Sequence, residues 1–142
     1  MKRHLLIILA YIVATFATQA TSHFVINVDH YAAIPYLRKE PIFQFGFLSM
    51  IIQGGVLSVL YAKAFSTYRT LQNAVGFSWM MGGFLVSYIA LAEAAKYTVP
   101  SIPSWIGIEL AASFIQFTLF GILLGLVYRG SDKSGTTSPV SR

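Results

Sequence analysis

The first of four long apolar segments closes with Thr21-Ser22-His23-Phe24-Val25-Ile26-Asn27-Val28-Asp29-His30. This segment carries polar side chains at spacings of four, four, four and three, namely Thr15, Gln19, His23, Asn27 and His30. On a helix that turns about 100° per residue these side chains form one stripe. A polar stripe is costly to expose to lipid, so we expect the other three apolar segments to pack around it.

The amino-acid composition is that of a membrane protein. Hydrophobic residues make up 56% of the 142 residues and charged residues 11%, against about 45–50% and about 25% in soluble domains. Four segments reach the ~20 residues that a spanning helix needs, at residues 5–28, 42–62, 74–95 and 105–127. We therefore predict an all-α fold, a four-helix transmembrane bundle over residues 1–128. Residues 129–142 are rich in Gly, Ser, Thr and Lys and are predicted to form a disordered cytoplasmic tail.

Basic residues are distributed unevenly between the two ends of the predicted bundle. If the amino terminus is cytoplasmic, the inside holds Lys2, Arg3, Lys63, Arg69, Arg129, Lys133 and Arg142, and the outside holds Arg38, Lys39 and Lys96. This bias predicts that both termini are cytoplasmic. The net charge of +5 is spread over the gaps between spans, so we expect the lipid bilayer as partner and no nucleic acid.

The start of the chain also fits a secretory signal peptide. Met1-Lys2-Arg3 precedes an apolar run, and Thr18-Gln19-Ala20 is a passable cleavage site. The apolar run continues to Val28, which is longer than the usual signal core of about 7–15 residues. We favour an uncleaved first span, and cleavage stays open as the alternative.

Polar and ionisable side chains recur in the other spans, and ionisable groups within a span indicate a functional site by default. We predict that they converge with the first stripe into an outward-facing polar pocket, with His23 paired to Glu109 or Glu93. The predicted pocket residues are His23, Asn27, His30, Gln53, Glu93, Glu109 and Gln116. The alternative is that these groups only join helices and are solvated at the interface, because both glutamates lie near the outer ends of their spans.

Small residues within the spans predict close helix contacts, because they let neighbouring backbones approach. The predicted helix-packing residues are Gly54, Ser58, Gly83, Gly121 and Gly125. The same small surfaces could instead dock onto another membrane protein or a second copy of the chain.

Several kinds of chemistry are not indicated. The chain has no cysteine, which excludes disulfides and thiolate sites. His23 and His30 are seven residues apart, about 10.5 Å along a helix axis, so we predict no metal site and no cofactor. No recognised catalytic motif is present, and the inner halves of the spans hold too few polar groups to suggest a monomeric channel.

Two pairs of segments resemble those of small uncharacterised four-span bacterial membrane proteins. They are Glu40-Pro41-Ile42-Phe43 with residues 48–54, and residues 91–96 with residues 103–109. The resemblance covers about residues 1–128 and implies a bacterial cytoplasmic (inner) membrane location without assigning catalytic residues. We therefore expect a non-enzymatic binding or permeation module with an outward-facing polar pocket; the alternative is an accessory or scaffolding subunit of a larger membrane complex.

Overall fold

The computed structural model describes residues 1–38, 40–65 and 69–132, with side chains given up to residue 129. The elements, in chain order, are α1 (Lys2–Thr21), the π-helical segment η1 (Ser22–Ile26), α2 (Val28–Ala32), α3 (Phe43–Ala64), α4 (Leu71–Ser87), the π-helical segment η2 (Tyr88–Glu93), α5 (Ala94–Lys96) and α6 (Ile102–Asp132).

Four helical stretches are long and apolar enough to cross a membrane, which confirms the predicted all-α, four-helix architecture. They are Lys2–Ile26, Phe43–Ala64, Leu71–Lys96 and Ile102–Arg129, and each limit lies within three residues of the predicted one. Large apolar side chains stay exposed along all four stretches, a surface that suits lipid rather than water. The last helix runs to Asp132, so the start of the predicted tail is helical, and residues 133–142 lie outside the described residues.

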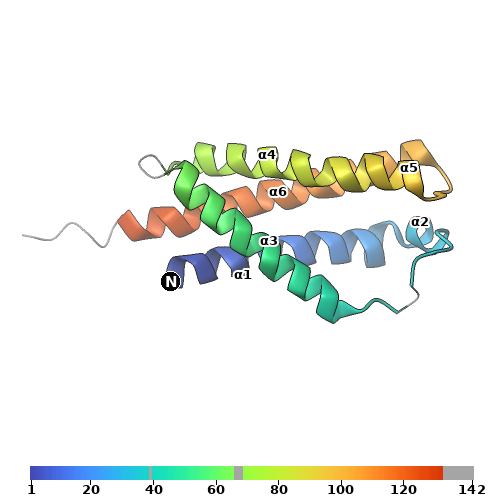
Figure 1. Cartoon of the computed structure of the whole chain (residues 1–142), viewed down its shortest axis with the longest axis horizontal. Helices are drawn as coiled ribbons and strands as arrows, with labels where there is room; N and C mark the ends of the chain where they lie inside the picture. Colours follow the sequence, from blue (N-terminus) through green and yellow to red (C-terminus); the bar gives the residue numbers. More distant parts are fainter. Residues whose placement is uncertain (39, 66–68, 133–142) are drawn as a thin grey trace, which may run out of the picture.

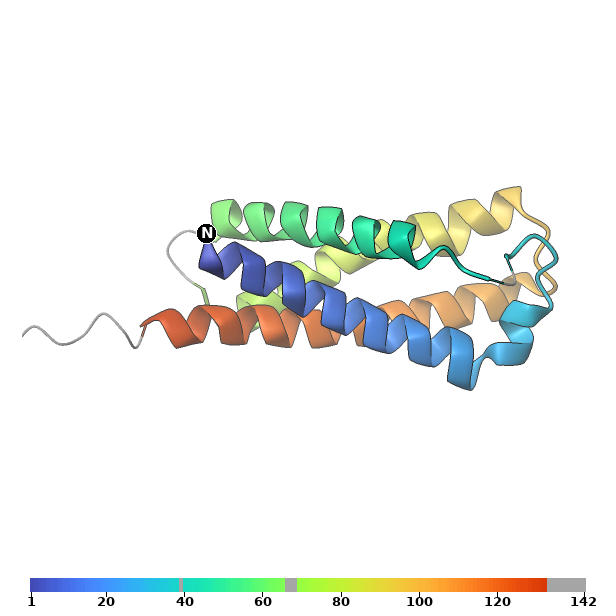
Figure 2. The ribbon, with the colours of Figure 1, turned by 90° about the horizontal axis from the view of Figure 1, so that it is seen from below.

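The helices form an incompletely closed bundle. The helix α6 packs against both α1 and α4, and α3 packs mainly against α1, with little contact between α3 and α4. Figure 1 shows α3 crossing α1 obliquely, so that its Phe43 end points away from α4. We call the end that holds the start of α1 and the end of α6 the basic end, and the end that holds α2 and α5 the loop end; they lie at opposite extremes of the molecule (Figures 1 and 2).

Toward the basic end the helices touch backbone to backbone at glycines. A Cβ atom added at Gly121 would lie 2.8 Å from Val75 Cα, and one at Gly54 would lie 3.2 Å from Ile8 Cα. Gly125 likewise packs on Leu71, and Ser58 is fully buried. The prediction of close packing at Gly54, Ser58, Gly121 and Gly125 is confirmed. These residues pack against other parts of the same chain and do not form an exposed surface.

The predicted packing role of Gly83 is wrong. A Cβ atom there would meet nothing within 4 Å, whereas one at Gly82 would lie 2.6 Å from the Phe117 ring. Neighbouring residues on a helix point about 100° apart, so the adjacent glycine faces α6 and Gly83 faces outward.

Two spans switch from α-helix to π-helix as they approach the loop end. The switch occurs at Ser22–Ile26 in the first span and at Tyr88–Glu93 in the third. A π-turn bonds residue i to residue i+5, which changes the register of the side chains that follow, and such turns are frequent at functional sites. After η1 the helix breaks at Asn27, and α2 begins in a new direction. The predicted single stripe therefore does not continue past His23.

Candidate binding site

A buried tyrosine, Tyr31, joins two of the predicted pocket residues at the loop end. Its hydroxyl donates a hydrogen bond of 2.8 Å to Glu109 Oε1, and its ring stacks on the His23 ring with centroids 3.7 Å apart. The Nδ1 atom of His23 lies 2.9 Å from the backbone oxygen of Gln19. The predicted direct pair of His23 with a glutamate is therefore wrong, because Tyr31 lies between His23 and Glu109.

The Tyr31 hydroxyl acts as a hydrogen-bond donor. Burial, and then the nearby Glu109 carboxylate, raise the pKa of Tyr31 well above its usual value, so the phenol keeps its proton near neutral pH. Glu109 itself is only 4% exposed, and the hydrogen bond compensates part of the cost of burying its carboxyl group.

His30 and Trp105 complete this cluster. The His30 ring meets the Tyr31 ring edge-on at 5.2 Å and lies 6.1 Å from the Trp105 ring. The indole Nε1 of Trp105 donates a 3.2 Å hydrogen bond to the backbone oxygen of Ile89 in η2. The Nε2 atom of His30 is buried without a hydrogen-bond partner among the described residues. The His30 ring is therefore held by its aromatic neighbours Tyr31 and Trp105.

Glu93 stays outside the cluster. Its carboxylate makes no hydrogen bond or ion pair with any described residue. Lys96, three residues further on, points its ammonium group over the Tyr88 ring at 5.0 Å and lies 3.4 Å from the Tyr88 hydroxyl. Lys96 is thus directed to Tyr88 rather than to Glu93.

The glutamines lie deeper and bond to one another and to α1. Gln19 Nε2 donates to Gln116 Oε1 at 2.8 Å, and Gln116 Nε2 donates to Thr15 Oγ1 at 3.0 Å. The Tyr11 hydroxyl donates to Gln53 Oε1 at 2.6 Å, and Gln53 Nε2 donates to Ser49 at 3.1 Å. These side chains tie α1 to α3 and α6, and Gln116 is only 4% exposed. We call them the mid-helix network.

A groove of about 860 Å³ lies near these groups, between α1 and α3 at the loop end. Its polar lining consists of Gln19, His23, Tyr31, Tyr36 and Arg38. The remaining walls are mostly apolar, from Phe16, Ala20, Phe24, Val28, Ala32, Ile34, Leu37, Pro41, Phe43, Gly46, Phe47 and Met50. We call this space the α1–α3 groove. Its volume is within the range of about 300–1,000 Å³ typical of small-molecule sites.

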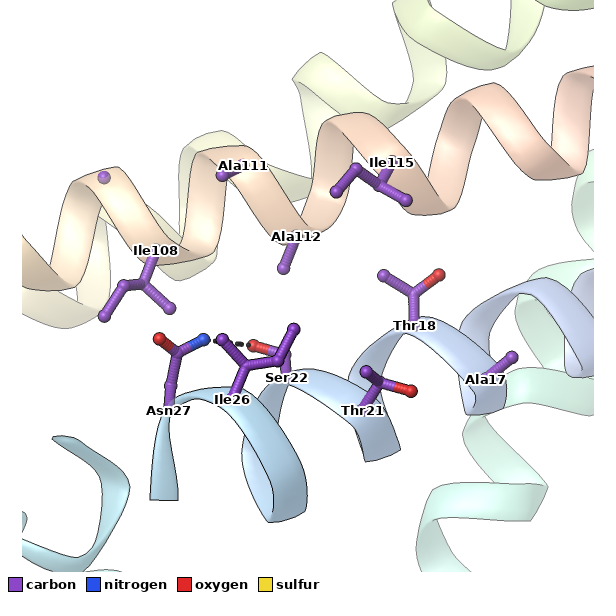
Figure 3. A pocket seen from close by; sticks show the side chains of 11 residues that line it. Ala17, Thr18, Thr21, Ser22, Ile26, Asn27, Ile108, Ala111, Ala112 and Ile115 are labelled. Carbon is purple, nitrogen blue, oxygen red and sulfur yellow. Dashed lines mark hydrogen bonds between the residues drawn. The ribbon is translucent and has the colours of Figure 1, made fainter. Parts of the chain in front are cut away.

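A second cavity of about 510 Å³ lies between α1 and α6. Figure 3 shows Thr18, Ser22 and Ile26 facing Ile108 and Ile115 across it. Asn27 Nδ2 donates to Ser22 Oγ at 3.0 Å on this side. The break after η1 thus places Asn27 in a different cavity from His23, although the sequence spacing put both on one face.

The predicted pocket residues therefore fall into separate groups. Tyr31 connects His23, His30 and Glu109; Gln53 and Gln116 belong to the mid-helix network; Asn27 and Glu93 lie apart. Sequence reasoning missed Tyr11, Tyr31 and Trp105. Tyr11 had a signal, since it lies four residues before Thr15 on the same stripe. Tyr31 had no such signal, because no sequence pattern shows that the π-turn would bury it.

Metal ligands do not gather within the described part of the chain, where no three His, Asp or Glu side chains could hold one ion. Four helices that are long and apolar enough to cross a membrane, together with the exposed apolar surface, indicate a multi-pass membrane protein. No known family model, curated protein or solved structure matches the chain.

Proposed function

We propose that the protein is a non-enzymatic binding module whose α1–α3 groove holds a single-chain amphiphile taken from the adjacent membrane leaflet. The observation that carries the proposal is the groove itself, with its apolar walls and its few polar groups. An acyl chain fits such walls, and Arg38 and Tyr36 offer donors for a carboxylate or phosphate head.

The burial of the other polar groups favours an apolar ligand over a small polar solute. Glu109 and Gln116 are each 4% exposed; Glu109 Oε1 accepts from Tyr31, and the amide of Gln116 accepts from Gln19 and donates to Thr15. A polar solute would have to displace these bonds, whereas an acyl chain can occupy the groove without disturbing them.

The location of the groove suits entry from the bilayer. Its lining runs from Phe16 to Phe24 on the first span and from Phe43 to Met50 on α3, about 12 Å and about 10 Å along the two helices at 1.5 Å per residue. The hydrocarbon core is about 30 Å thick, so the groove reaches well into one leaflet and remains within it.

We also propose that the loop end faces outward, that both termini are cytoplasmic, and that the protein resides in a bacterial inner membrane like the four-span proteins it resembles. The basic-residue bias supports this orientation. Reporter fusions after residues 68 and 130 should both read as cytoplasmic, and an external reading at either position would reverse or break the proposed topology.

The groove can be tested by filling it. A Cβ atom at Gly46 would meet nothing within 4 Å, and Gly46 lines the groove, so Gly46→Trp should fold and occupy the space. Gly55→Trp is the matched control, because Gly55 lies on the same helix with open space around it and outside the groove lining. Native mass spectrometry would count bound dodecanoate and lysophosphatidylglycerol on each protein.

We expect the wild type and Gly55→Trp to bind one amphiphile saturably, and Gly46→Trp to bind it at least ten-fold more weakly. Equal, non-saturating uptake by all three proteins would mean that the groove holds only bulk lipid. A loss of dimer mass in Gly46→Trp, without bound amphiphile in the wild type, would instead assign the groove to a contact between two copies.

A further inference from the structure

Two arginines converge on one buried tyrosine at the basic end. The guanidinium carbon of Arg3 lies 4.8 Å from the centroid of the Tyr128 ring, and that of Arg69 lies 4.7 Å from the same centroid. They come from α1 and from the residues just before α4, whereas Tyr128 belongs to α6. The two positive charges are therefore held within roughly one Debye length, ~10 Å at 0.1 M salt.

No described acidic side chain neutralises these charges. Asp29, Glu40, Glu93 and Glu109 all lie toward the loop end, and the side chain of Asp132 is not among those described. Arg69 donates from Nε to the backbone oxygen of Phe65 at 2.7 Å, which caps the end of α3. Arg3 makes no hydrogen bond within the described residues, so its donors remain open to an anion.

The surroundings add polar and apolar groups that suit a lipid headgroup. The ring of Tyr61 lies 5.2 Å from that of Tyr128, and its buried hydroxyl has no hydrogen-bond partner among the described residues. The next residue after Arg3 is His4, whose Nδ1 atom lies 2.6 Å from Ser58 Oγ. Beside them Leu5, Leu6 and Leu9 are exposed, which gives acyl chains an apolar surface to follow into the membrane.

We propose that Arg3 and Arg69, positioned by Tyr128, form a binding site for the phosphate of an anionic lipid headgroup at the basic end. Guanidinium groups bind phosphate through paired N–H donors, and basic pockets between spanning helices on the cytoplasmic side bind such headgroups. The two cation–π contacts hold the arginines in place before the lipid arrives. This site is at the opposite end of the molecule from the α1–α3 groove and does not depend on it.

The test compares Arg3→Gln with Lys2→Gln. Both variants lose one positive charge at neighbouring positions of the same end, but Lys2 is exposed and, unlike Arg3 and Arg69, is not one of the cations over the Tyr128 ring. Arg3 is the better target because Arg69 also caps α3. Native mass spectrometry of the full-length protein would measure the affinity for phosphatidylglycerol and for phosphatidylcholine with the same acyl chains, with and without excess inorganic phosphate.

We expect the wild type to bind phosphatidylglycerol with about ten-fold higher affinity than phosphatidylcholine. The loss of affinity for phosphatidylglycerol should be at least five-fold larger in Arg3→Gln than in Lys2→Gln. Excess inorganic phosphate should leave the lipid bound. Equal losses in the two variants would overturn the proposal, because they would show only diffuse attraction to the surface charge. Equal binding of both lipids, or displacement of the lipid by inorganic phosphate, would also overturn it.

Discussion

The two ends of the bundle are built in different ways. Toward the basic end α1, α3, α4 and α6 are drawn together at Gly54, Gly121 and Gly125, around a core that includes Tyr61, Phe77 and Tyr128. Toward the loop end two spans become π-helical, α3 diverges from α4 (Figure 1), and two cavities remain beside the first span. The comparison indicates that close packing at one end holds the fold while the other end keeps an open groove.

The largest expected effect concerns the packed end. Gly121→Leu places a side chain where a Cβ atom would already lie 2.8 Å from the backbone of Val75, so α4 and α6 must separate. We expect the free energy of unfolding in detergent to fall by about 3 kcal/mol, at the upper end of overpacking effects.

The matched control is Gly83→Leu, at a glycine with nothing within 4 Å. It should change the free energy of unfolding by about 0.5 kcal/mol or less, as surface substitutions usually do. If the two variants lose similar stability, the basic end is not held by close glycine contacts.

The second prediction concerns the cluster at the loop end. In a double-mutant cycle, Tyr31→Phe and Glu109→Gln should show a coupling energy of about 1.5 kcal/mol, because the phenol donates to a buried carboxyl group. The cycle of His23→Ala with Glu109→Gln should give less than about 0.5 kcal/mol, since His23 and Glu109 make no direct contact. A reversed order would mean that His23, and not Tyr31, is the partner of Glu109.

The difference between the regular α-helices and the π-helical segments shows what the sequence could and could not predict. Apolar length alone predicted the four spans, and the Gly121-xxx-Gly125 spacing predicted a close helix contact, whose partner, α4, only the structure identifies. The side chains in regular α-helix followed their spacing, and so Gln19 and Thr15 meet Gln116. Beyond Ser22 the spacing failed, because a π-turn leaves no recognisable pattern in the sequence and it moves each later side chain to a new face.

The smallest expected change tests the mid-helix network. Gln116→Leu removes an amide that accepts from Gln19 and donates to Thr15, and should cost about 1 kcal/mol, within the range for polar contacts between membrane helices. Gln44→Leu is the control, because Gln44 is exposed near the loop end of α3, and should cost about 0.3 kcal/mol or less. Equal costs, measured by unfolding in detergent, would mean that the network adds nothing to helix association.

The most direct test of the open groove uses the absence of cysteine from the chain. Gly46→Cys and Gly55→Cys each provide one thiol on α3, at positions where a Cβ atom has open space, and only the first lines the groove. A fluorophore on each thiol would be titrated with bromine-labelled dodecanoate in nanodiscs. We predict saturable quenching at position 46, displaced by unlabelled dodecanoate, and only weak, linear quenching at position 55. The same linear quenching at both positions would contradict an amphiphile site between α1 and α3.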